Sequence, residues 1–220
     1  MPPFSPLIDQ AIELAAEWHD QTYRKSRWRP TQYDAPAEHL HRVPVMAHVT
    51  AVAMSVARAG WDEEPVAAAF LHDLLEDGNQ YGSTFSYAQL AETMGTRVAD
   101  LVQGVTERKR DETGAWRRWD DRKRDYIEAL RNGLPGSVAI SLADKTHNFW
   151  TMNQALALGI DIFSDAPGRK GLSAGPERQS WYVHSVLDAS LGHEDARLEP
   201  LRAQLRDEIE RFEALIAEQA

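Results

Sequence analysis

The chain has 220 residues, a hydrophobic fraction of 43% and a formal net charge of −10 at pH 7. This length suits one sizeable domain, no stretch approaches the run of about 18 apolar residues that a membrane span needs, and the N-terminus lacks the basic and apolar regions of a signal peptide. The absence of cysteine excludes disulfides, a thiolate zinc site and a cysteine nucleophile. We therefore expect a cytoplasmic protein without a membrane partner.

The acidic charge also indicates the kind of ligand. Proteins that bind nucleic acid as their main ligand are usually basic, so this class is disfavoured. Basic residues concentrate in the segment 107–124. Taken singly, each of them is most simply a solvated surface residue. An acidic chain with one local basic segment suits a small anionic ligand better than a long polyanion.

Apolar residues at three- and four-residue spacing predict helices along the whole chain. The first is expected over 7–23, with Ser5 and Pro6 as its N-cap and first-turn residues. Residues 26–42 have no periodicity, and we expect a loop and a variable insertion there. Further helices are predicted over residues 44–59, 66–77, 86–95, 96–105, 119–132, 136–158, 177–191 and 200–218.

The run from Val138 to Ala143 is short and partly β-branched, so it is compatible with a buried strand or with a helix. We expect a helix, because the apolar pattern continues to Leu158 and the neighbouring segments are helical. A loop is expected over 160–175. We therefore predict an all-α fold of about eight to ten helices. A single domain over residues 1–220 is expected, with a core over about 7–192 and a C-terminal helix over about 200–218.

Four polar residues close the apolar stretch 66–78, namely His72, Asp73, Glu76 and Asp77. On a helix, the last two would lie one turn beyond the first two. Such groups are costly to bury unless something binds them, and a divalent metal suits imidazole and carboxylate ligands. A solvated acidic helix end explains the His-Asp pair more simply when that pair is considered alone. The rest of the chain therefore has to decide between the two interpretations.

Two more polar residues lie on faces that are otherwise apolar. His48 shares the face of the predicted helix 44–59 with valines, and Asp144 lies on the predicted helix 136–158. A lone histidine on an apolar face is usually a hydrogen-bonded core residue. Combined with His72 and Asp73, however, these residues form a sensible ligand set for Mn²⁺, Fe²⁺ or Zn²⁺, and such ions activate water as a nucleophile.

Residues beside the candidate ligands suit the remaining roles of a hydrolase. Glu76 and Asp77 follow the His-Asp pair closely enough to transfer a proton or to orient water. Lys145 and Asn148 follow Asp144 and could hold an anionic substrate.

Five segments occur in a characteristic order: HDQTYRK at 19–25, PVMAH at 44–48, LHDLLED at 71–77, LVQGVT at 101–106 and LADKTHN at 142–148. They resemble motifs of the HD-domain phosphohydrolases, and within them the alarmone hydrolases, which comprise the hydrolase domain of the RelA/SpoT homologues and small stand-alone relatives. The His-Asp pair alone is a weak signal. The following Glu-Asp pair, the G-V-T segment and the L-A-D-K-x-x-N segment, in this order, are specific.

The resemblance implies a Mn²⁺-dependent enzyme that removes the 3′-pyrophosphate of (p)ppGpp or of a related alarmone such as ppApp. Fe²⁺, Zn²⁺ and Co²⁺ are alternative metals. The implied metal ligands are His48, His72, Asp73 and Asp144, and the implied catalytic residues are Glu76 and Asp77. The implied substrate-binding residues are Arg24, Lys25, Thr106, Lys145, Asn148, Arg178 and Tyr182.

The sequence departs from the family pattern in several places. Val45 and Val49 replace an aromatic residue and a proline often found there, and the segment 26–42 separates Arg24 and Lys25 from His48. Alternatives therefore stay open: a phosphatase acting on another phosphorylated nucleotide, such as the 2′-phosphate of NADPH, or a nucleotide-binding module without activity. An antitoxin role with a cognate alarmone-synthetase toxin as partner and a homo-oligomeric state are further expectations. The chain is expected to be too short to carry a synthetase domain itself.

Overall fold

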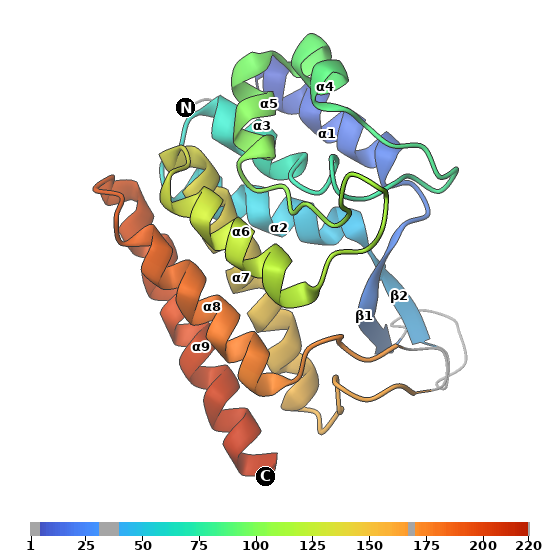
Figure 1. Cartoon of the computed structure of the whole chain (residues 1–220), viewed down its shortest axis with the longest axis vertical. Helices are drawn as coiled ribbons and strands as arrows, with labels where there is room; N and C mark the ends of the chain where they lie inside the picture. Colours follow the sequence, from blue (N-terminus) through green and yellow to red (C-terminus); the bar gives the residue numbers. More distant parts are fainter. Residues whose placement is uncertain (1–4, 31–39, 167–169, 220) are drawn as a thin grey trace.

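The structure is a computed structural model that describes residues 5–30, 40–166 and 170–219. Nine α-helices dominate these ranges (Figure 1). They are α1 (Pro6–Trp18), α2 (Val45–Arg58), α3 (Glu63–Phe70), α4 (Tyr87–Met94), α5 (Thr96–Gln103), α6 (Trp119–Arg131), α7 (Pro135–Leu156), α8 (Pro176–Ser190) and α9 (Glu199–Gln219), with a 3₁₀ helix, η1 (Ala196–Leu198), before α9. The predicted all-α class is confirmed.

Local capping explains several helix starts. The side chain of Ser5 accepts a hydrogen bond of 3.2 Å from the backbone N–H of Ile8, and Pro6 occupies the first turn of α1. Ser86 and Gln89 form a reciprocal capping box at the start of α4. The helix predicted over 7–23 nevertheless ends at Trp18. The chain turns at Gln21, which has a positive φ of 52°, and continues as a strand.

A β-hairpin corrects the expectation of a loop over 26–42. Strands β1 (Tyr23–Pro30) and β2 (Leu40–Pro44) pair in antiparallel fashion, with Tyr23 opposite Pro44 and Pro30 opposite Leu40, and the register is irregular between Tyr23 and Trp28. In an antiparallel pair, backbone N–H and C=O groups of one strand form hydrogen bonds with those of the other. Such pairing requires no periodic apolar residues, so the hydrophobic pattern of residues 26–42 did not reveal it. Residues 31–39, also expected in the insertion, lie outside the described ranges.

The second correction concerns the helix predicted over 66–77. Helix α3 ends at Phe70, and hydrogen-bonded turns follow, with the N–H of Leu74 2.9 Å from the carbonyl oxygen of Leu71 and the N–H of Asp77 3.1 Å from that of Asp73. Leu71 and Leu74 are completely buried. Buried leucines at this spacing satisfy a helix and a series of turns equally well, so periodicity could not locate the helix end.

Helix α7 is the central element of the fold. It packs against α2, α3, α5, α8 and α9. In Figure 1, α8 and α9 run alongside it toward the bottom of the view, while α1, α4 and α5 lie at the top. Val138, Ile140 and Leu142 are completely buried within it, and the preference for a helix over a strand in this run is confirmed. One apolar cluster extends from Ile8 in α1 to Phe212 in α9. Asp144 lies on this buried helix and is therefore in the interior of the molecule.

In the described part of the chain, no helix combines the length and hydrophobicity that crossing a bilayer would require.

Candidate active site

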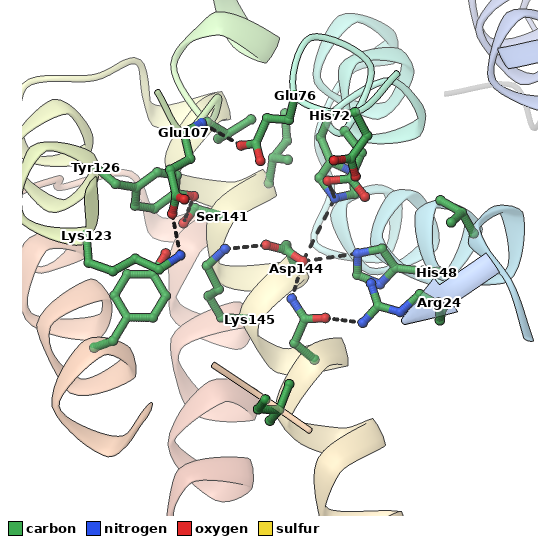
Figure 2. A pocket seen from close by; sticks show the side chains of 18 of the residues that line it. Arg24, His48, His72, Glu76, Glu107, Lys123, Tyr126, Ser141, Asp144 and Lys145 are labelled. Atoms are coloured by element: carbon green, nitrogen blue, oxygen red, sulfur yellow. Dashed lines mark hydrogen bonds and ion pairs between the residues drawn. The ribbon is translucent and has the colours of Figure 1, made fainter. Parts of the chain in front are cut away.

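All four predicted metal ligands line one cavity, and three of them form a close cluster there (Figure 2). His48 comes from α2, His72 from the turn after α3, and Asp144 from α7, and one ligand atom from each lies within 4.8 Å of the others. Nε2 of His48 is 3.1 Å from Oδ1 of Asp144, and Nε2 of His72 is 3.9 Å from the same oxygen. All three side chains are buried. The fold thus brings together three donors from segments that are far apart in sequence.

A hydrogen bond at one ring nitrogen of His72 leaves the lone pair of the other ring nitrogen open. Its Nδ1 lies 2.8 Å from the carbonyl oxygen of Ala69, and a carbonyl can only accept, so Nδ1 carries the proton. Nε2 then presents a lone pair toward Asp144. This atom is buried and has no hydrogen-bond partner among the described residues. A buried nitrogen that has no hydrogen-bond partner and lies close to carboxylates fits a metal ligand.

The charges around the cluster favour a cation. Burial acts to raise the pKa of Asp144, but Lys145 and His48 hold it well below its usual value. Burial acts to lower the pKa of His72, but the carboxylates of Asp73 and Asp144 raise it overall. Two ionised carboxylates therefore create a negative potential at the open ring nitrogen of His72. A divalent cation would be stabilised by the same potential.

His48 differs from His72 in the direction in which its pKa is shifted. Burial and the nearby positive charge of Arg24 lower its pKa to about 3, so its ring is neutral at physiological pH, as a metal ligand must be. Its Nδ1 lies 2.7 Å from Nδ1 of His147 on α7. His147 was missed by the sequence analysis, although it lies inside the segment 142–148, because nothing in the motif marks it as the partner of a distant histidine.

Asp73 lies beside the cluster of three. Its Oδ1 is 3.3 Å from Nε2 of His72, and its side chain lines the same cavity. Burial acts to raise the pKa of Asp73, but His72 and His48 lower it overall. An ionised carboxylate is therefore available as a fourth donor at the edge of the cluster.

The Glu76 and Asp77 carboxylates line the cavity next to the candidate ligands. Glu76 accepts a hydrogen bond from the backbone N–H of Glu107, and its Oε2 lies 3.1 Å from Nζ of Lys109. The same ammonium group is 2.7 Å from Oδ1 of Asp77. Burial raises the pKa of Glu76 despite the opposing effect of Lys109. A carboxylate with a raised pKa is better matched to accepting a proton near neutral pH.

Four of the seven predicted substrate-binding residues lie at the cavity. Arg24, Lys145, Asn148 and Tyr182 line the cavity. Thr106 and Arg178 are not among its described lining residues: the Thr106 hydroxyl donates to the carbonyl oxygen of Val102 over 2.8 Å, and Arg178 pairs with Asp120 over 2.6 Å. The backbone of Lys25 belongs to β1, and its side chain lies outside the described part of the structure.

Several lining residues are not in the predicted set of site residues. The cavity has a volume of about 290 Å³ and includes Glu107, Lys123 and Tyr126 in its walls. Glu107 is buried and paired with both Arg122 and Lys123. The Lys123 ammonium lies 4.4 Å from the ring centroid of Tyr182. The only sequence signal for this wall was the local basic segment 107–124, which did not distinguish buried from solvated charges.

The described residues thus form an all-α protein with a buried His-His-Asp centre beside two carboxylates. A family model described as "HD domain" matches residues 28–164. The chain belongs to the HD domain family. The predicted resemblance to the HD-domain family is confirmed.

The chain is also similar to named relatives. It is 35% identical over 100 residues to a guanosine-3′,5′-bis(diphosphate) 3′-pyrophosphohydrolase of Aquifex aeolicus, covering 46% of this chain and 12% of that protein. It is 29% identical over 237 residues to a probable enzyme of the same name from Synechocystis, covering 94% of this chain and 28% of that protein. The chain therefore spans only a minor part of the length of these curated relatives.

Solved structures resemble it over a larger share of their length. A metazoan SpoT orthologue, described as hydrolysing ppGpp, superposes with a TM-score of 0.65 at 25% identity, covering 98% of this chain and 99% of the other. A protein of Listeria monocytogenes superposes with a TM-score of 0.62 at 29% identity, covering 77% of this chain and 97% of the other.

Proposed function

We propose that this protein is a metal-dependent hydrolase that removes the 3′-pyrophosphate of ppGpp or of a related alarmone. The observation that carries the proposal is the presence, in one cavity, of the His48, His72 and Asp144 cluster beside Glu76 and Asp77. A cluster of metal donors next to a carboxylate with a raised pKa suits water-driven cleavage of a phosphate ester. The names of the similar proteins supply the substrate class.

The four residues His48, His72, Asp73 and Asp144 would hold the metal, and we propose Mn²⁺. Mixed imidazole and carboxylate donors suit this ion and also Fe²⁺, Zn²⁺ or Co²⁺. When bound, a divalent ion supplies a Lewis acid for the phosphoryl oxygens and lowers the pKa of water. Nε2 of His72, which is buried and has no hydrogen-bond partner among the described residues, and the ionised carboxylates beside it support this assignment.

Glu76 is the proposed proton acceptor. In the reaction, the oxygen of water forms a bond to the phosphorus nearest the ribose, and the bond from that phosphorus to the 3′-oxygen breaks. Glu76 takes a proton from the attacking water, and this proton is then available to the departing 3′-oxygen. The products are the nucleoside 5′-diphosphate and pyrophosphate. The raised pKa of Glu76 supports this role, because a stronger base accepts the proton more readily.

The cavity also holds cations for an anionic substrate. Arg24, Lys123 and Lys145 line it. Arg24 donates a hydrogen bond to Oδ1 of Asn148, and the Asn148 amide donates to Asp144 over 2.6 Å. Burial acts to lower the pKa of Lys145, but Asp144 raises it well above its usual value, so this lysine stays charged. We propose that Arg24, Lys145 and Asn148 contact the phosphates and that Tyr182 lines the nucleotide site.

A substrate panel tests the proposal. The purified, Mn²⁺-loaded protein is incubated with ppGpp, ppApp, NADPH and nucleoside monophosphates, and the products are followed by ³¹P NMR and chromatography, with the Glu76→Gln variant as control. Pyrophosphate from an alarmone supports the proposal. Orthophosphate from NADPH or a monophosphate would indicate the phosphatase alternative, and binding without turnover would indicate a binding module. The expected synthetase partner and homo-oligomer stay predictions.

A further inference from the structure

Lys109 makes an unusual bridge between the two proposed catalytic carboxylates. It lies in the connection between α5 and α6, and its Nζ is 3.1 Å from Oε2 of Glu76 and 2.7 Å from Oδ1 of Asp77. The Lys109 side chain is 21% exposed and that of Glu76 15%, so this contact is shielded from solvent more than an ordinary surface ion pair, while Asp77 is 44% exposed. Burial acts to lower the pKa of Lys109, but Glu76 and Asp77 raise it well above its usual value.

Lys109 differs from the other lysines near the site in its relation to the cavity. Among the described lining residues are Glu76, Asp77, Lys123 and Lys145, but not Lys109. A lysine that binds substrate phosphates should present its ammonium group to the cavity, as Lys123 and Lys145 do. Lys109 instead bridges the two proposed catalytic carboxylates, whereas Lys123 pairs with Glu107 and Lys145 pairs with Asp144.

Both carboxylate oxygens of Glu76 are held by the same connecting segment. The backbone N–H of Glu107 donates to Oε1, and Lys109 contacts Oε2. The segment is itself anchored, because the Glu107 side chain pairs with Arg122 and Lys123 of α6 and the carbonyl oxygen of Lys109 accepts a hydrogen bond of 3.0 Å from the N–H of Arg117. The orientation of the Glu76 carboxylate is therefore set by a fixed part of the fold.

We propose that Lys109 is a positioning residue for the hydrolytic reaction, acting through Glu76 and Asp77. The inference rests on the proposed function, since it presumes that Glu76 takes a proton from water. Without the ammonium group, two neighbouring carboxylates would repel each other and Oε2 of Glu76 would lose its partner. The carboxylate would then leave the orientation needed to reach the water, and small misplacements of a catalytic group are costly in rate.

Kinetics of Lys109 variants test the proposal. Lys109→Met keeps the length of the side chain and removes its charge. We expect kcat to fall roughly 10- to 100-fold with little change in KM, which is at or below the lower end of the roughly 10²- to 10⁴-fold contribution of general acid–base catalysis, because Glu76 is misplaced and not removed. Lys109→Arg keeps the charge and should restore most of the rate. Lys170→Met is the matched control, because Lys170 is exposed and has no place in the cavity. In a Glu76→Gln background, Lys109→Met should cause no further loss of kcat, because both changes disable one unit.

A measurement without turnover complements the kinetics. In the metal-free protein, the ¹⁵N spectrum of the lysine ammonium groups should contain a slowly exchanging Lys109 signal, assigned by its absence in Lys109→Met. This signal should be lost or shifted in a Glu76→Gln, Asp77→Asn double variant and unaffected by Lys170→Met. It reports the bridge directly, even for a variant whose activity has fallen below detection.

The outcomes separate this inference from the proposed function. A wild-type protein that cleaves no nucleotide contradicts the proposed function itself. A wild-type protein with turnover and a Lys109→Met variant of equal kcat contradicts only the role of Lys109. A rise in KM at constant kcat would show that Lys109 binds substrate, and additive losses with Glu76→Gln would show that it acts independently of Glu76. Either result overturns the positioning role.

Discussion

Nδ1 of His48 and Nδ1 of His147 lie 2.7 Å apart, so the two imidazole rings share one hydrogen bond. His147 follows Asp144 by three residues on α7, and its ring stacks on Trp150 with centroids 5.9 Å apart. One helix therefore provides both a candidate ligand and the partner of another ligand. If Nε2 of His48 binds a metal, its Nδ1 must donate and Nδ1 of His147 must accept. Such a bond fixes the tautomer and the orientation of the ligand.

Replacing His147 should therefore weaken metal binding. We expect His147→Phe, which keeps an aromatic ring but removes the acceptor, to lower Mn²⁺ affinity by about 10- to 100-fold, the range for lost partners of metal-binding histidines. Competition with a chelator of known affinity measures this change. His184→Phe is the matched control, because His184 is half exposed on α8 and pairs with Glu213 away from the cavity. An unchanged affinity in His147→Phe would show that the contact has no role at the metal.

Ligand and catalytic residues should respond differently to substitution. His72→Ala or Asp73→Ala should remove both bound metal and activity, because each deletes a proposed donor. Glu76→Gln should keep the metal and lose kcat by about 100-fold or more, the scale of general acid–base catalysis. Elemental analysis beside turnover assays measures both properties. Full activity in His72→Ala or Asp73→Ala would refute the ligand assignment, and loss of metal in Glu76→Gln would mean that Glu76 is itself a ligand.

Glu107 should make stability depend on pH in the acid range. Burial acts to raise the pKa of Glu107, but Lys123 and Arg122 lower it overall below 4.5. The unfolded chain therefore takes up this proton first as the pH falls, so the stabilisation is complete well above pH 4.5 and is lost as the pH falls through the lower pKa of the folded state.

The Glu107→Gln variant tests this dependence. At pH 7 it should lower the free energy of unfolding by about 3 kcal/mol, because it leaves two cations without their buried partner. The difference from wild type should shrink at acid pH, as measured by urea unfolding at several pH values. Glu128→Gln, which breaks an exposed pair with Arg131, should cost little. A Glu107→Gln difference that stays constant down to the acid range would contradict the lowered pKa.

Gly104 should be intolerant of a side chain for a packing reason. A Cβ atom there would lie 2.5 Å from Oγ of Ser137, which is buried on α7 and donates to the carbonyl oxygen of Leu101 over 2.9 Å. We expect Gly104→Ala to destabilise the protein by about 1 to 3 kcal/mol, as overpacking usually does, measured by urea unfolding. Gly175→Ala is the control, because nothing lies within 4 Å of its Cβ position. Equal stabilities for the two variants would contradict the close approach of α5 to α7.

The helical class and most helix positions were predictable from the amino-acid sequence alone. Periodic apolar residues report burial on one side of a helix, so α2, α7 and α9 could be placed within a few residues. The candidate chemistry was also visible, because His72, Asp73, Glu76 and Asp77 follow one another in a short segment. His48 and Asp144 were predicted as polar residues on otherwise apolar helix faces, and the order of the motifs supported the same ligand set.

The contacts between side chains that are distant in sequence became visible only in the folded structure. The bridge from Lys109 to Glu76 and Asp77 joins residues 32 and 33 positions apart, and the bond between His48 and His147 joins residues 99 positions apart. The pairing of β1 with β2 and the end of α3 at Phe70 were equally hidden. Hydrophobic periodicity describes one segment at a time, whereas ion pairs, strand pairing and the environment of a buried histidine depend on segments that only folding brings together.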